Sequence, residues 1–132
     1  MNDIMMQLGG FQFGVSTAAY QELSRAAEYR WAAQDRFGQR PALQYTGLGE
    51  ETITLTGVIF PEYRGGTEQV KIMRDVAQRA EPLLLVDGLG GVHGRWVIER
   101  VDEMQTVFGA GGSPRKQEFT LALRKFDDGS GL

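Results

Sequence analysis

Two segments of this chain alternate apolar and polar residues with a period of two, and this alternation most restricts the possible fold. Residues 51–60 alternate threonines with aliphatic residues, and residues 117–124 do the same with Phe119, Leu121 and Leu123. Successive side chains of a strand point to opposite faces, so the pattern predicts half-buried antiparallel strands. The expected core combines these strands with one helix: Ile53, Leu55, Phe119, Leu121, Leu123, Val70, Met73 and Ala77.

Glycine-containing links predict how these strands connect. The link at 47–50 predicts a turn inside a hairpin over residues 42–60, and Gly88–Gly91 predicts the turn of a second hairpin over 83–101. Shorter strands are expected at residues 11–15 and 105–108. The segment 16–34 fits a turn or short helix to about Ser24, followed by a strand through Trp31.

One helix is predicted, with Thr67 as its N-cap and Glu81-Pro82 at its end. Its apolar stripe consists of Val70, Met73, Ala77 and Ala80. Six or seven strands with one helix predict a mainly β (α+β) fold, an antiparallel β-sandwich or barrel whose open face the helix covers. We expect one domain over residues 1–126, a flexible link at 109–114, and a flexible C-terminal tail at 127–132.

Composition excludes several kinds of site. The chain has no cysteine and one histidine, which excludes disulfides, thiolate nucleophiles, iron–sulfur clusters and most zinc sites. With 14 basic and 17 acidic residues, the formal charge of −3 argues against a strongly basic nucleic-acid binder. We therefore expect no cofactor and no metal ligand. The first ten residues lack a signal-peptide pattern, so folding in a cytoplasm is expected.

A small hydrolase is the alternative from the enzyme class. His93, next to the predicted turn, is the only candidate imidazole base, and it would need a serine and an orienting carboxylate. No serine stands in a nucleophile-elbow pattern. A pair of carboxylates is the other option, drawn from Glu50, Glu51, Asp87, Glu99, Asp102 and Glu103. Acids at strand ends and turns are common on any domain surface, so both options are weaker than a turn-lining histidine and solvated acids.

A cluster of aromatic residues and arginines is the strongest candidate for a subunit interface. It consists of Tyr29, Arg30, Trp31, Arg36 and Arg40. Tyrosine, tryptophan and arginine predominate in interface hot spots. Carboxylates of a neighbouring subunit would pair with the arginines, and the candidates are Glu50, Glu51 and Glu99. The competing interpretation places both aromatics in the core of one subunit and the arginines in solvent.

An ordered set of segments resembles the GpU family of contractile-tailed phages. These segments are 20–25, 28–31, 40–47, 49–55, 82–88, 94–99 and 114–119. The resemblance runs from about Met5 to Phe126, and one departure is Ala32, where the family has proline. It implies a tail-assembly protein, also encoded in prophages and phage-tail-like bacteriocins, and no catalytic residues.

The resemblance also implies partners and a location. It implies a tail-tube-like subunit that joins copies of itself in a ring, which we expect to be a hexamer, within the virion tail. Other tube, sheath or baseplate proteins would be its partners, with DNA only as passing cargo and no membrane. Two positions stay open: a ring at the baseplate-proximal end of the inner tube, or a head-proximal tail terminator.

Overall fold

The computed structural model describes residues 4–14, 20–59, 68–109, 111 and 114–127. This part of the chain holds seven strands and one helix. In chain order they are β1 (Ile4–Leu8), β2 (Phe11–Gly14), β3 (Tyr20–Arg36), β4 (Gln39–Ile59), α1 (Gln69–Gln78), β5 (Leu83–Asp87), β6 (Val92–Phe108) and β7 (Pro114–Lys125). The predicted mainly antiparallel β fold with one helix is confirmed.

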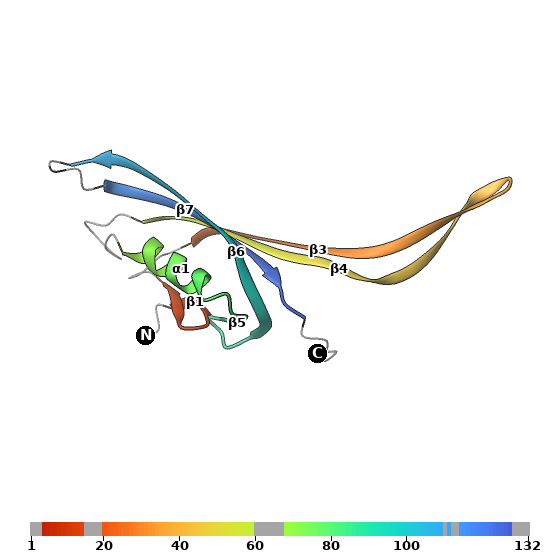
Figure 1. The fold of residues 1–132 in the computed structure, drawn as a ribbon, viewed down its shortest axis with the longest axis horizontal. Coiled ribbons are helices and arrows are strands. Elements are labelled where there is room, and N and C mark those ends of the chain that lie inside the picture. Colours follow the sequence, from red (N-terminus) through yellow and green to blue (C-terminus); the bar gives the residue numbers. More distant parts are fainter. Residues whose placement is uncertain (1–3, 15–19, 60–67, 110, 112–113, 128–132) are drawn as a thin grey trace.

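The strands form one antiparallel sheet in the order β2-β1-β5-β6-β7-β4-β3. The sheet curls until side chains of its two outer strands meet. The ring centroid of Phe13 on β2 lies 6.0 Å from that of Tyr20 on β3. Helix α1 packs against β6 and β2 and covers the interior of the curled sheet (Figure 1). The result is a barrel-like body from which the far parts of β3 and β4 extend.

The core lies between the curled sheet and α1. Leu55 on β4 pairs with Leu121 on β7, which in turn pairs with Val101 on β6, so one apolar row crosses three strands. Every predicted strand residue of the core is buried, as are Val70 and Met73 of α1. Ala77 is only half-buried; the third buried residue of the helix is Val76.

The predicted turn at 47–50 is wrong. Strand β4 runs unbroken through these residues, and the real turn is Phe37-Gly38, between β3 and β4. The register with β3 shifts between Ala27 and Tyr29 and again between Arg30 and Trp31, with the extra residue on β4 each time. Gly47 has a φ of 138° beside these shifts. Glycine permits a β-bulge as readily as a turn, and here it marks bulges.

Other expectations were wrong in detail. The turn or short helix expected up to about Ser24 is absent from Tyr20 onward, because β3 already begins at Tyr20. The short strand expected at 105–108 is the end of the long strand β6, and β1 was not predicted. The N-cap of α1 is Glu68, so the predicted cap at Thr67 is wrong by one residue. Two predicted features lie partly or wholly outside the described residues: the link at 109–114 and the tail beyond residue 127.

Candidate functional site

The far parts of β3 and β4 form a two-stranded arm, defined here as Ala27–Arg36, the turn Phe37-Gly38, and Gln39–Glu51. β7 pairs with β4 only from Thr52 onward, so beyond that point β3 and β4 have only each other. The arm extends well away from the body (Figure 1). All seven predicted interface residues lie on it: Tyr29, Arg30, Trp31 and Arg36 on β3, and Arg40, Glu50 and Glu51 on β4.

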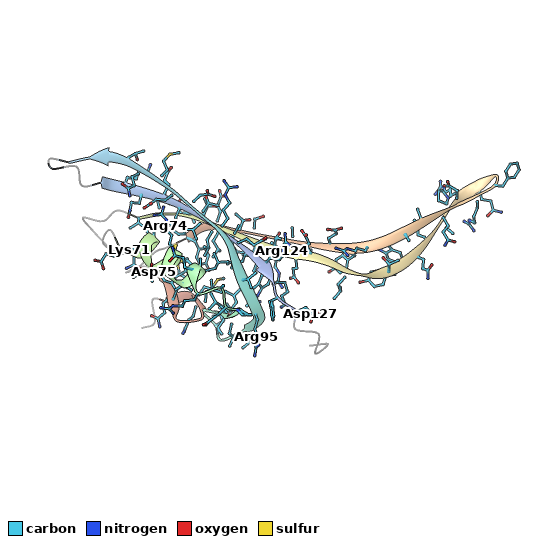
Figure 2. All side chains as sticks on the ribbon, viewed as in Figure 1. Lys71, Arg74, Asp75, Arg95, Arg124 and Asp127 are labelled. Carbon is cyan, nitrogen blue, oxygen red and sulfur yellow. The ribbon has the colours of Figure 1, made fainter. Side chains whose placement is uncertain are left out.

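One face of the arm is apolar, and we call it the apolar face. Directly paired residues of antiparallel strands share a face, and alternate residues of β3 return to it. Its members are the pairs Tyr29–Leu48, Trp31–Tyr45 and Ala33–Leu43. The rings of Trp31 and Tyr45 lie 5.1 Å apart, centroid to centroid. Side chains of the arm project into open space on both faces (Figure 2).

The exposure of these side chains decides between the two interpretations of the aromatic cluster. Tyr29 is 60% exposed and Trp31 58% exposed, so the interpretation that buries them in the core of one subunit is wrong. That they lie between subunits stays a prediction. Such large apolar side chains side by side on a surface are typical of a binding site.

Four apolar residues of the arm were missed by the sequence analysis: Phe37, Leu43, Tyr45 and Leu48. Phe37 is fully exposed at the turn. The β4 residues on the apolar face are Leu43, Tyr45 and Leu48, and their spacing changes from two to three at a bulge. The bulges hide the period-two signal that would have placed these residues on one face.

The predicted acidic partners are already engaged within the chain. Arg25 donates to the Glu51 carboxylate at the base of the arm. Arg124 lies 3.4 Å from Glu50 and 3.0 Å from Glu99. Towards the tip the charges differ, since Arg30, Arg36 and Arg40 form no ion pair with any residue that the structure describes. Arg36 Nε donates to the Arg40 carbonyl oxygen at 3.0 Å, which holds the two sides of the turn together.

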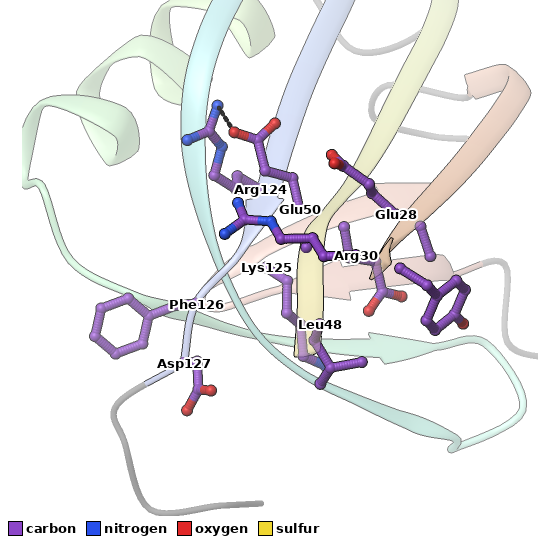
Figure 3. Close-up of a pocket in the computed structure, with 12 residues that line it drawn as sticks. Glu28, Arg30, Leu48, Glu50, Arg124, Lys125, Phe126 and Asp127 are labelled. Atoms are coloured by element: carbon purple, nitrogen blue, oxygen red, sulfur yellow. Dashed lines mark ion pairs between the residues drawn. The ribbon is translucent and has the colours of Figure 1, made fainter. Parts of the chain in front are cut away.

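A hollow of about 340 Å³ lies where the arm leaves the body. Glu28, Arg30 and Leu48 line it from the arm, and Arg124 and Lys125 line it from the end of β7 (Figure 3). Both acidic and basic side chains line it, and Gly49 leaves room for Glu28, whose Cβ lies 2.9 Å from where a Cβ at Gly49 would stand. Side chains of both charge signs, from the arm and from the body, therefore line the hollow. No single sign of charge predominates that would select a ligand.

His93 stabilises the turn between β5 and β6. Its Nε2 lies 2.9 Å from Asp87 Oδ2, and Asp87 Oδ1 accepts hydrogen bonds from the backbone N–H groups of Leu89 and Gly91. The hydrogen bond from His93, then those from Gly91 and Leu89, lower the pKa of Asp87. Burial, followed by the charge of Asp87, raises the pKa of Tyr20 at the start of β3.

The His93 backbone is tied to the end of β7. Its carbonyl oxygen accepts from Trp96 Nε1 at 3.0 Å and from Lys125 Nζ at 2.6 Å. The Lys125 and Arg25 side chains lie over the Trp96 ring, 5.1 Å and 5.5 Å from its centroid. No serine of the described residues hydrogen-bonds to His93. These contacts match the interpretation of His93 as a turn-lining residue.

The carboxylates proposed for a hydrolase are each bonded to a basic group. Besides the Glu50, Glu51, Asp87 and Glu99 contacts given above, Asp102 Oδ2 lies 2.7 Å from Arg100 Nε and Glu103 Oε1 lies 2.7 Å from Arg74 Nη2. The structure therefore gives each of these acids a basic partner, whereas an acid–base mechanism needs two carboxylates that face one substrate.

The described ranges hold no helix of the length and hydropathy needed to cross a membrane. Nowhere in them do three or more potential metal-binding side chains of the His, Cys, Asp or Glu types come together.

Comparison with known proteins gives three informative likenesses. A segment of the "Probable tape measure protein" of Halomonas phage phiHAP-1 is 35% identical over 109 residues, covering 83% of this chain and 12% of that protein. This chain thus spans only a small part of the length of that relative. The crystal structure of the Dit protein (gp 19.1) of phage SPP1, described as a hub adsorption apparatus protein, has a TM-score of 0.68 at 12% identity; the match covers 96% of this chain and 51% of Dit.

A component of the tail of an empty gene transfer agent particle, solved with C6 symmetry, has a TM-score of 0.56 at 16% identity, over 96% of this chain and 95% of that one. At such low sequence identities, these two likenesses show only that the structures have the same fold as this chain. The family model "Phage P2 GpU" matches residues 9–128, nearly the whole chain. The chain belongs to the Phage P2 GpU family of phage tail proteins.

Proposed function

We propose that this protein forms a hexameric ring at the baseplate-proximal end of the inner tube of a contractile tail. The ring subunit is a single β domain over residues 1–126. It is assembled in the host cytoplasm from copies of itself and becomes part of the virion tail, where tube, sheath or baseplate proteins contact it.

The observation that carries the proposal is the arm on a barrel-like body. A two-stranded ribbon is only marginally stable in water, and this one exposes three cross-strand apolar pairs. Such an element is stabilised when another molecule covers it. Because the arm and the body are different surfaces, contact between them is heterologous, and heterologous contacts that close after a fixed rotation generate rings.

The comparisons favour a ring of six near the hub. One structure with this fold is a hub adsorption protein, and another comes from a tail with C6 symmetry. The relative named a tape measure protein joins a segment like this chain to a much longer protein. Covalent joining in that relative favours a position of the ring beside a tape measure protein.

The sheet face that points away from the core suits a channel wall. Rows across β4, β7 and β6 on this face include Thr56, Thr120 and Asp102, which pair in that order. A hollow on the same face is lined by Asp102 and Glu118, among others. These carboxylates would repel DNA phosphates, so DNA would pass as cargo without binding.

Electron microscopy of the purified protein tests the ring. We expect closed particles with six-fold symmetry and a central hole. A different rotational symmetry would overturn the hexamer, and particles that remain single chains at the concentrations reached in an infected cell would overturn self-assembly.

A deletion phage tests the position. A ring that starts the tube should be needed for any tube to form, so its deletion should abolish tubes. A head-proximal terminator stops growth, so its deletion should give tubes of uncontrolled length. The second outcome would favour the terminator and overturn the baseplate-proximal position.

A further inference from the structure

The tip of the arm is the most exposed apolar point of the described chain. Phe37 stands fully exposed in the turn, with Arg36 before it and Arg40 two residues after Gly38. Neither guanidinium has an ion-pair partner among the described residues. An aromatic ring flanked by arginines without ion pairs has the composition of an interface anchor, the kind of residue that fills a pocket on a partner.

The outer part of the arm, residues 29–49, differs in charge sign from the rest of the chain. Residues 29–49 contain three arginines and one aspartate, a formal charge of +2. The remaining residues hold 11 basic and 16 acidic residues, a formal charge of −5. The outer part of the arm of one copy is therefore attracted to the body of another, and this complementarity selects a second copy of the chain as the partner.

The body carries an apolar groove of about 250 Å³ at the C-terminal end of α1. Val76 and Ala80 line it from the helix and the residues after it, and Leu83 and Ile98 line it from β5 and β6. Glu81 is the charged residue among those that line it, and it forms no ion pair within the described chain. The groove thus offers apolar walls and one free carboxylate.

Ala80 is an unusual choice for its place in this groove. Its φ is 54°, in the left-handed region that glycine occupies without strain. A methyl group there adds apolar wall to the groove. The arm cannot reach this groove within one chain, because it extends from the body in the direction away from α1 (Figure 1). Only another molecule can fill the groove with an arm.

We propose that the tip of the arm of one copy, residues 36–40, docks in this groove at the C-terminal end of α1 of a second copy. The ring of Phe37 lies against Ala80, Leu83 and Ile98, and the arginines beside it face Glu81. The inference rests on the proposed self-assembly and adds which two surfaces meet. The Phe37 anchor and Glu81 were not among the interface residues expected from the sequence.

Cysteine cross-linking tests the contact directly, because the chain has no cysteine of its own. Gln39→Cys protein, which keeps the Phe37 ring, is mixed with Ala80→Cys protein under mild oxidation, and covalent dimers are measured by gel electrophoresis. The matched control replaces Ala80→Cys by Leu89→Cys, which lies in the fully exposed β5–β6 turn. All three sites are exposed, so the variants are expected to fold. We expect about tenfold more dimer with Ala80→Cys than with Leu89→Cys.

Charge exchange on the same pair tests the role of Glu81. Adding Glu81→Arg to the Ala80→Cys chain should lower the yield of cross-linked dimer about tenfold. Adding Arg40→Glu to the Gln39→Cys chain as well should restore most of it, because the pair is then reversed in sign. Loss without restoration would overturn the contact between the arginines and Glu81.

Electron microscopy of the same samples separates this inference from the proposed function. Six-fold rings with equal cross-linking to Ala80→Cys and Leu89→Cys would overturn the docking and leave the ring intact. Specific cross-linking in open chains or dimers would support the docking and overturn the ring. The absence of both rings and cross-links would overturn both.

Discussion

At the scale of single residues, the core depends on side chains that span the sheet. Leu121 is 1% exposed and pairs with Leu55 and Val101 on its two sides. Leu121→Ala should lower the free energy of unfolding by about 2–5 kcal/mol, because the cavity left behind collapses only in part. Urea unfolding measures this, with the fully exposed Leu89→Ala expected within about 0.5 kcal/mol of the wild type. A loss under about 1 kcal/mol for Leu121→Ala would contradict the assigned core.

The β5–β6 turn gives the second prediction at this scale. Hydrogen bonds from His93, Gly91 and Leu89 lower the pKa of Asp87 below its ordinary 3.8. The native state therefore binds this proton less tightly than the unfolded state, and the ionised carboxylate stabilises the native state above pH 3.8. That contribution is lost as the pH falls through the lowered pKa. The difference in unfolding free energy between wild type and Asp87→Asn should thus shrink on acidification, and a constant difference from about pH 6 to pH 2 would contradict this.

At the scale of elements, the alternation of apolar and polar residues predicted those strands that have one face on the core and the other face in solvent. The period of two is visible in β7 and in residues 51–59 of β4 because one face meets the core and the other meets solvent. The outer part of β3 is rich in alanine, glutamate, glutamine and arginine, which favour helices, and it has no core to alternate against. Pairing with β4 makes it a strand, and no local signal shows that pairing. In β4 the glycines at the bulges have the sequence pattern of a turn, and this pattern hides both the arm and half of its apolar face.

The candidate interface was predicted at the level of residue type. Tyr29, Trp31 and the three arginines were identified because such residues are enriched in hot spots. Phe37, Leu43, Tyr45 and Leu48 could be added only after the register was known, since bulges change their spacing. The groove beside α1 joins residues from three elements, and no sequence pattern connects them.

The arm itself should be dispensable for folding. None of residues 20–52 is buried, so the arm contributes no side chain to the core. Excising residues 30–47 and joining Tyr29 to Leu48 through Asn-Gly, a dipeptide suited to a tight hairpin turn, should leave the body folded. The thermal unfolding midpoint should change by only a few degrees, while rings should be absent by electron microscopy. Loss of the folded body would contradict the division into arm and body.

At the scale of the whole molecule, residues 29–49 and the rest of the chain carry net charges of opposite sign. These two parts meet only when copies associate. The +2 of residues 29–49 faces the −5 of the rest of the next copy, so attraction across the interface should weaken as salt rises. The double variant Arg36→Glu, Arg40→Glu changes the charge of this segment from +2 to −2. Both side chains are exposed, so the variant should fold, as circular dichroism can confirm.

The two proteins should then respond to salt in opposite directions. The Debye length falls from about 10 Å at 0.1 M to about 3 Å at 1 M, which screens attraction in the wild type and repulsion in the variant. Assembly of the wild type, followed by light scattering, should decrease across this range, and that of the variant should begin low and increase. The apolar face remains in both proteins and supplies the association that repulsion suppresses at low salt. If both responded to salt with the same sign and the same slope, the arginines of the tip would lie outside the interface, and the apolar face alone would hold the copies together.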